Sequence, residues 1–415
     1  MSILIKNIKK LIQVEYKPQL MVVGKEMAKI NTIDDAYLYI ENEYIDGFGK
    51  MADLKHVNYD VKSDIIDATG KMVFPSFADS HTHLVYAGSR EIEYIDKIKG
   101  LSYEEIAKRG GGILNSARLL HNTSEDDLFE QALKRTHEII KQGTGAVEIK
   151  SGYGLNSDDE IKMLRVIRRL KESSPLQIKA TFLGAHAIPA EFKNNQSEYV
   201  DIIINEMIPA VAAEDLADFI DVFCDKGFFT VYDTDRILMA GMKYGLRAKI
   251  HANELANSGG VQVGVKYNAL SVDHLEHMGD EEIDCLLKTE TMPTILPGAA
   301  FFLGLPLSPA RKMIDAGLPI AIASDFNPGS SPAGDMKFMQ SLGCINYRLL
   351  PEEVLNASTI NSAYAMDLSE KTGSIAIGKL ANVFITKEIP SFEFFYYAYT
   401  SYLIDTVILN GKIIV

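Results

Sequence analysis

Apolar, β-branched runs recur along the middle of the chain and alternate with stretches of helical period. The runs are KMVFPSFADSH, GAVEIKSG, IKATFLGAH, FIDVFCD, RAKIHANE, LSVDHLEH, TMPTILPGA and PIAIASDFNP. Helical patterns separate most of them, over residues 127–143, 158–174, 232–245, 280–290 and 309–317, and several end in glycine, a common helix stop. Eight strands alternating with helices predict an α/β fold of the (β/α)8 TIM-barrel type. A doubly wound open sheet is the alternative, but no Gly-x-Gly-x-x-Gly motif follows an early strand.

Short strand-like pieces dominate both ends of the chain. SILIKNI, AYLYIENEYIDGFG and DIIDAT lie before residue 70, and Asp46-Gly47 is a hairpin signal in the second of them. At the other end NVFITKE and DTVILNGKIIV read as strands, with a two-residue turn at Asn410-Gly411. These patterns predict a small β-sandwich domain formed by both termini, residues 1–73 plus 366–415, around a barrel of residues 74–365.

Charge and composition narrow the class of protein. The 415 residues are 47% hydrophobic and 24% charged, and the net charge is −14, so we expect no nucleic-acid partner. The sequence has no apolar run of about 18 residues, so we expect no membrane helix, and the first residues lack the pattern of a secretory signal. The three cysteines, Cys224, Cys285 and Cys344, form no Cys-x-x-Cys pair and suit the reducing cytoplasm.

Ionisable residues gather where the predicted barrel strands end. They are His81 and His83 (strand 1), His186 (strand 3), His251 and Glu254 (strand 5), His274 and His277 (strand 6) and Asp325 (strand 8). A barrel carries its active site at the carboxyl ends of its strands. This distribution therefore predicts one catalytic site at that face.

The His-x-His pair is the core of a predicted metal site. Side chains two apart on a strand share a face, so His81 and His83 point together, and His251 and Asp325 complete a set of three nitrogens and one carboxylate. That set suits a catalytic zinc or ferrous ion. Each residue also has a plainer interpretation: a hydrogen-bonded histidine, a core residue at His186, or a helix N-cap at Asp325. The coincidence of ligand types from independent strands favours the metal.

Several motifs identify a family resemblance. They are DSHTHLVYAGSR (79–90), EIKSGYGL (148–155), LGAHAIP (183–189), HANE (251–254), DHLEH (273–277), SDFNPGSSP (324–332) and GSIAIGKLANVFI (373–385). The chain resembles the amidohydrolase superfamily of metal-dependent hydrolases and, within it, the imidazolonepropionase family, over nearly its whole length. Asn382 stands where superfamily members commonly have aspartate, at a structural position. Lys150 is interpreted as structural, because the resemblance is to the subgroup with one metal rather than to members with a carbamylated lysine.

The resemblance implies a set of residues and a reaction. It implies one divalent ion, zinc or iron, held by His81, His83, His251 and Asp325, and substrate contacts at Arg90, Tyr153, His186, Glu254, Asn327, Gly329 and Ser330. His274 would stand beside the attacking water, and His274, Glu254 and Asp325 would be the catalytic groups, with acid and base unassigned. The implied reaction is hydrolysis of the cyclic amide of 4-imidazolone-5-propanoate to N-formimidoyl-L-glutamate in histidine degradation.

Arg90 carries the prediction about substrate charge. The sequence shows no evident local partner for it, since Glu91 points elsewhere if the segment is extended, and a guanidinium suits the propionate of an anionic small molecule. Other cyclic amidohydrolases, deaminases and a non-catalytic scaffold are the alternatives. We further expect a homodimer, the commonest oligomer, and no membrane partner.

Overall fold

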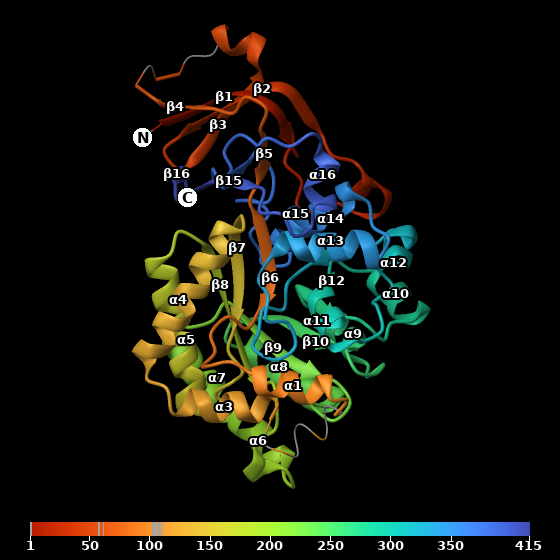
Figure 1. Ribbon diagram of the computed structural model, residues 1–415. Helices are drawn as coiled ribbons and strands as arrows, with labels where there is room; N and C mark the ends of the chain where they lie inside the picture. Colours follow the sequence, from red (N-terminus) through yellow and green to blue (C-terminus); the bar gives the residue numbers. More distant parts are fainter. Residues whose placement is uncertain (1, 57–58, 61, 102–104, 106–108, 110) are drawn as a thin grey trace.

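The computed structural model describes residues 2–56, 59–60, 62–101, 105, 109 and 111–415. Figure 1 shows two parts: a sheet that contains both chain ends, and below it a barrel wrapped by helices. The barrel and the part built from both termini confirm the predicted fold class, and the terminal strands that were predicted as a β-sandwich form one hydrogen-bonded sheet. Within the described residues, no helix is long and apolar enough to cross a membrane.

One eight-stranded sheet forms the smaller part. Its strand order is β16-β15-β14-β5-β1-β2-β3, and β4 pairs with β1. The bounds are β1 (Ser2–Ile12), β2 (Thr32–Glu41), β3 (Tyr44–Lys50), β4 (Asp64–Asp67), β5 (Met72–Pro75), β14 (Val383–Thr386), β15 (Ile404–Leu409) and β16 (Lys412–Ile413). The antiparallel pair β5–β14 joins the two ends of the chain, with Phe384 opposite Phe74.

The two predicted hairpin turns had different outcomes. Asn410-Gly411 does connect β15 to β16. The prediction at Asp46-Gly47 is wrong: the turn lies at Asn42-Glu43, and Gly47 is inside β3 opposite Tyr39. Asn42 adopts the left-handed φ of 55° that this turn requires, and asparagine tolerates that conformation better than most residues.

Eight parallel strands in sequential order form the barrel. They are β6 (Phe77–Thr82), β7 (Thr144–Lys150), β8 (Gln177–Ala185), β9 (Phe219–Cys224), β10 (Arg247–Ala252), β11 (Ser271–His274), β12 (Met292–Ile295) and β13 (Ala321–Ile322). The last strand is short, and the barrel closes just beyond it. There Thr82 bridges to Phe326, and the backbone N–H of Asp325 donates to the carbonyl of His81 at 3.0 Å.

The helices cover the outside of the barrel. They are α1 (Glu91–Ile98), α3 (Ile113–His121), α4 (Glu125–Lys141), α5 (Ser157–Ser173), α6 (Gln196–Ile202), α7 (Ile208–Ala213), α8 (Val231–Met242), α9 (Gly260–Lys266), α10 (Asp280–Leu286), α11 (Pro297–Leu303), α12 (Ala310–Ala316), α13 (Met336–Asn346), α14 (Pro351–Ser358), α15 (Ile360–Tyr364) and α16 (Phe392–Tyr397). Side chains of Ser124, Asn156 and Thr230 cap α4, α5 and α8. Each helix predicted between strands begins within two residues of its expected position, whereas α8 and α10 end three and four residues before the predicted ends at 245 and 290.

The first predicted barrel strand is in fact two strands. β5 belongs to the terminal sheet, and β6 begins the barrel after Ser76. Phe74 and Phe77 lie on either side of this junction, and both rings pack on Phe384 and Phe395. The aromatic cluster fastens the sheet to the amino-terminal end of the barrel. The predicted domain boundaries at residues 73/74 and 365/366 remain predictions.

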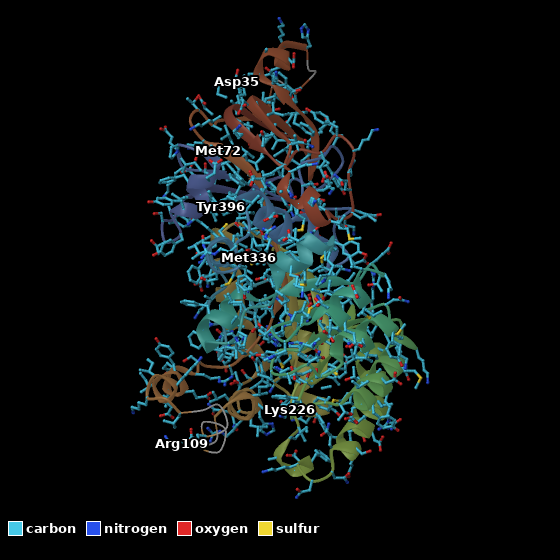
Figure 2. The ribbon with its side chains drawn as sticks, turned by 90° about the vertical axis from the view of Figure 1, so that its right-hand side faces the viewer. Asp35, Met72, Arg109, Lys226, Met336 and Tyr396 are labelled. Atoms are coloured by element: carbon cyan, nitrogen blue, oxygen red, sulfur yellow. The ribbon has the colours of Figure 1, made fainter. Side chains whose placement is uncertain are left out.

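The carboxyl ends of the barrel strands face away from the terminal sheet. In Figure 2, Lys226, two residues beyond β9, lies at the opposite end of the molecule from Asp35 and Met72 of the sheet. The predicted site is thus at the open end of the barrel.

Candidate active site

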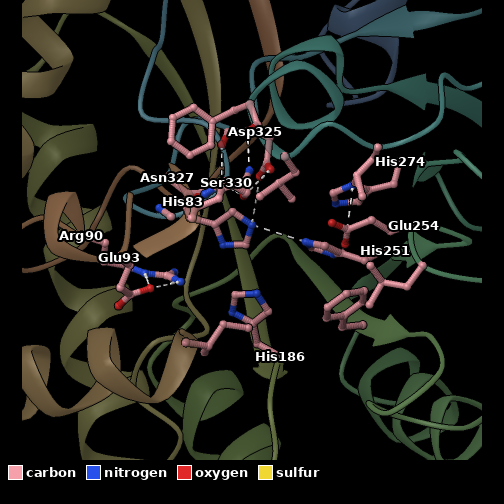
Figure 3. Close-up of a pocket in the computed structure, with 18 of the residues that line it drawn as sticks. His83, Arg90, Glu93, His186, His251, Glu254, His274, Asp325, Asn327 and Ser330 are labelled. Atoms are coloured by element: carbon pink, nitrogen blue, oxygen red, sulfur yellow. Dashed lines mark hydrogen bonds and ion pairs between the residues drawn. The ribbon is translucent and has the colours of Figure 1, made fainter. Parts of the chain in front are cut away.

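A cavity of about 580 Å³ opens at the carboxyl ends of the barrel strands. Its inner wall carries histidines and carboxylates from several strands, and its outer wall carries residues of α1 and α11 (Figure 3). The predicted site residues that line it are His83, Arg90, Tyr153, His186, His251, Glu254, His274, Asp325, Asn327, Gly329 and Ser330. The structure therefore brings these side chains into one pocket, and their individual roles stay predictions.

The four predicted ligand residues converge at the bottom of this cavity. Nε2 of His83 lies 3.3 Å from Nε2 of His251. Asp325 Oδ1 lies 3.7 Å from Nε2 of His81 and 3.6 Å from Nε2 of His83. A four-coordinate ion with bonds of about 2.1 Å needs ligand atoms about 3.4 Å apart. Nε2 of His81 is buried and has no hydrogen-bond partner among the described residues. The ligand atoms of His81, His83 and Asp325 lie within 4.8 Å of one another, and His251 groups in the same way with His81 and His274 or with His83 and His186, so donors that fit a metal ion are gathered here.

Two buried carboxylates fix the orientation of two of these imidazoles. Nδ1 of His81 donates to Asp273 at 2.6 Å, and Nδ1 of His251 lies 2.9 Å from Asp221. A proton on Nδ1 leaves Nε2 with its lone pair toward the cluster, which is the form that binds a metal. Neither aspartate was predicted from the sequence, although Asp273 directly precedes His274.

Lys150 supports both carboxylates. Its ammonium lies 2.8 Å from Asp221 and 3.9 Å from Asp273, and 2.6 Å from Glu148 on the same strand. Burial disfavours the charge, but Asp221 and Glu148 raise the pKa of Lys150 above its ordinary value. His251 and Lys150 outweigh burial and hold the pKa of Asp221 well below its usual range. The structural interpretation of Lys150 thus becomes specific: it is the shared counterion beneath the ligand cluster.

The SGYGL segment after β7 forms a second wall of the pocket. Glu160 of α5 accepts hydrogen bonds from the backbone N–H groups of Gly152, Gly154 and Leu155 at 2.7–3.0 Å. The carbonyl of Gly152 in turn accepts from Nδ1 of His186 at 2.9 Å. Burial lowers the pKa of His186 to about 3, so its ring is neutral. Glu160 is a site residue that motif matching missed, because it lies in a helix rather than in the motif.

The loop after β13 is held by its own side chains. Oδ1 of Asn327 accepts from the backbone of Gly329 and Ser330 at 2.7 and 2.8 Å, and its Nδ2 donates to the Asp325 carbonyl at 2.6 Å. Oγ of Ser330 donates to Asp325 Oδ2 at 3.1 Å, on the opposite side from the histidines. The loop therefore orients Asp325 as well as lining the pocket.

Glu254 and His274 stand together beside the cluster. Oε2 of Glu254 lies 3.8 Å from Nδ1 of His274, as the dashed line in Figure 3 marks. Burial, with Asp325 nearby, raises the pKa of Glu254 to about 8, and burial lowers the pKa of His274 well below its usual value. Burial also raises the pKa of Asp325 to about 7. Near neutral pH, Glu254 can thus hold a proton while His274 is uncharged.

Two details of the sequence-based picture need correction. His277 does not sit in strand 6: β11 ends at His274, and His277 follows in a half-buried turn where its N–H donates to the Asn253 carbonyl. Arg90 does have a local partner. The segment after it is helical rather than extended, so Glu93 comes within 2.8 Å of Nε and 2.7 Å of Nη2 of Arg90.

Comparisons with known proteins show what the chain is similar to. The model of the amidohydrolase family matches residues 72–414. An imidazolonepropionase of Christiangramia forsetii is 56% identical over 414 residues, and one of Flavobacterium johnsoniae is 53% identical over 414 residues, each with 100% of both chains covered. Among solved structures, E. coli guanine deaminase aligns with a TM-score of 0.76 at 13% identity, covering 100% of this chain and 99% of that one. At that identity the last likeness shows the fold alone.

Proposed function

Because the chain belongs to the amidohydrolase family, we propose that it hydrolyses the cyclic amide of 4-imidazolone-5-propanoate to N-formimidoyl-L-glutamate, a step of histidine degradation. Its full-length likeness to two imidazolonepropionases supports this substrate. The observation that carries the proposal is the presence in one pocket of a ligand-type cluster and an arginine, Arg90. The cluster suits amide hydrolysis, and the arginine suits a carboxylate tail.

The donor set supports one divalent ion, zinc or iron, held by His81, His83, His251 and Asp325. Such an ion supplies Lewis acidity, which polarises the ring carbonyl and lowers the pKa of water. Imidazole and carboxylate ligands suit both metals, so the choice between them needs elemental analysis.

Two side chains carry the proton transfers, and a third stabilises the charge that develops on the substrate. Asp325 accepts a proton from the attacking water, since its carboxyl oxygen Oδ1 faces the same space as the histidine nitrogens. Neutral His274 donates a hydrogen bond to the oxygen that becomes negative as the ring carbonyl turns tetrahedral. The pKa of Glu254 is raised to about 8, so its side chain is protonated near neutral pH. It donates this proton to the ring nitrogen as the carbon–nitrogen bond breaks.

Binding of the propionate falls to the outer wall of the pocket. Arg90 and the phenol of Tyr153 face the cavity, and the Tyr153 ring lies 5.4 Å from the ring of His186. A guanidinium binds a carboxylate strongly at a site that is largely shielded from water. This contact discriminates the anionic substrate from neutral rings such as those of nucleobases.

The proposal extends to the surroundings of the enzyme. A small anionic substrate, a cytoplasmic location and no nucleic-acid or membrane partner are predicted from the sequence. A homodimer is expected only because it is the commonest oligomer, and all of these stay predictions. The net charge of −14 supports the absence of a nucleic-acid partner.

A turnover assay tests the function. The protein, loaded with zinc or ferrous ion, is mixed with freshly prepared imidazolonepropionate, and loss of the ring chromophore is followed with release of N-formimidoyl-L-glutamate. Turnover with kcat/KM in the ordinary enzymatic range, about 10⁴ M⁻¹s⁻¹ or above, is expected. Deamination of a nucleobase by the same preparation, with no action on imidazolonepropionate, would refute the proposal in favour of a deaminase.

A further inference from the structure

Glu93 makes three hydrogen bonds and one further ion-pair contact beside the substrate pocket, and none of the motifs pointed to it. Its Oε2 accepts from Nε of Arg90 at 2.8 Å and from the backbone N–H of Gly112 at 3.0 Å, and it lies 2.7 Å from Nη2 of Arg90. Its Oε1 accepts from Nδ2 of Asn115 at 3.0 Å. The carboxylate thus connects α1, the start of α3 and the arginine, and Figure 3 shows it beside Arg90 at the edge of the cavity.

Burial distinguishes this pair from an ordinary surface ion pair. The side chains of Arg90 and Glu93 are 9% and 13% exposed, whereas exposed pairs gain little from their charges. Glu93 is itself held by the backbone N–H of Gly112 and by the side chain of Asn115, so its carboxylate is fixed in place. An arginine held along its Nε edge cannot rotate about its last bonds, and less conformational freedom is lost when it binds an anion.

Gly329 makes the second contact that positions the Arg90 guanidinium. A Cβ built on Gly329 would lie 2.0 Å from Nη1 and 2.4 Å from Cζ of Arg90. The guanidinium therefore lies directly on the backbone of the loop after β13, in space that any other residue would fill. The loop that orients Asp325 thus also receives the arginine, which links the anion site to the reaction centre.

We propose that Glu93 and Gly329 are positioning residues that hold the Arg90 guanidinium for the carboxylate of the substrate, Glu93 by its Nε edge and Gly329 by the space it leaves. This inference rests on the proposed function, whose substrate is an anion. Glu93 lines the same cavity, but its carboxylate has the same negative charge as the substrate tail. It therefore acts through Arg90 rather than as a ligand of that tail.

The test is a set of matched variants assayed on two compounds. E93Q removes the charge of Glu93 at constant size, and E91Q makes the same change at an exposed neighbour whose carboxylate bonds Ser89. The compounds are imidazolonepropionate and an imidazolone with an uncharged alkyl tail. E93Q should raise KM for imidazolonepropionate about tenfold with kcat changed less than about threefold, and should alter turnover of the uncharged compound little. E91Q should match the wild type on both.

A double variant distinguishes positioning from a separate contribution. If Glu93 acts through Arg90, E93Q should change KM less than about twofold in an R90M background. The inference would be overturned if the KM increases of E93Q and R90M multiplied in the double variant. It would also be overturned if E93Q impaired both compounds equally, or if E93Q behaved like E91Q. A wild-type protein inactive on imidazolonepropionate would instead refute the proposed function.

A second variant guards against misfolding of E93Q. G329A keeps Glu93 and places a methyl group against the guanidinium, so it should raise KM in the same selective way. G47A, which adds the same methyl group where nothing lies within 4 Å, is its control. If G329A binds imidazolonepropionate as well as G47A does, the space left by Gly329 is not required to position Arg90.

Discussion

Replacing Asp273 by asparagine should weaken metal binding without touching a ligand. Asp273 and His81 are both fully buried and 2.6 Å apart, and Lys150 lies 3.9 Å from the same carboxyl oxygen. D273N keeps an oxygen that can accept the hydrogen bond of Nδ1. It removes the negative charge that makes the His81 imidazole a better electron-pair donor to a metal, and it leaves the positive charge of Lys150 with one buried carboxylate fewer to balance it. Loss of such a supporting carboxylate typically costs 10- to 100-fold in metal affinity, or about 1.4–2.7 kcal/mol.

The assay is a competition between the protein and a chromophoric chelator for zinc. Asp79→Asn is the control, because Asp79 is equally buried on the same strand as His81 but accepts its hydrogen bonds from Ser324 and from the backbone of His81 rather than from an imidazole. D79N should change the unfolding midpoint while moving the dissociation constant of zinc less than about threefold. If D273N binds zinc as tightly as D79N does, Asp273 does not set the ligand form of His81 and the argument fails.

Three further outcomes follow from the same geometry. His81→Ala should lose most of its bound metal and activity, as elemental analysis would show; a fully active, metal-free preparation would contradict the metal site. Arg90→Met should keep its metal and raise KM for imidazolonepropionate by the equivalent of about 2–4 kcal/mol, while a compound without the carboxylate is little affected; equal impairment of both would make Arg90 structural. Because burial raises the pKa of Glu254 from 4.5 to about 8, the folded metal-free protein holds a proton that the unfolded chain releases. The contribution of Glu254 to stability should therefore be lost as pH rises from about 5 to 8, against the opposite trend of the buried neutral histidines. With chelator present, the thermal stability of the wild type should decline relative to that of E254Q over this range; parallel pH dependences of the two proteins would count against a neutral Glu254.

The strands and the ligand cluster were predictable because each depends on local sequence. A buried barrel strand is apolar along its length, so an imidazole or carboxylate at its carboxyl end stands out, as at His81, His251 and Asp325. Parallel strands in sequential order then bring these ends together without any knowledge of distances. The same logic placed Glu254 and His274 in the pocket.

The supporting residues were not predictable in this way. Asp221, Asp273 and Lys150 come from three strands, and their contacts depend on which side chains point into the barrel at the same level. Glu93 was missed for a different reason. Glu93 lies three positions after Arg90, which is a contact spacing on a helix and not on an extended segment, so the error in local structure hid the partner.

The pairing of β5 with β14 has a consequence for how the chain is made. The two strands lie roughly 300 residues apart, so their pairing is strongly non-local, whereas the barrel strands pair with their neighbours in the chain until the closing contact between Thr82 and Phe326. During synthesis β1, β2 and β5 are made before the barrel and β14 is made after it. The edge of β5 that pairs with β14 therefore stays unpaired until the whole barrel has been translated. That edge is open to other chains for the length of translation, and β14 is the strand that ends the exposure.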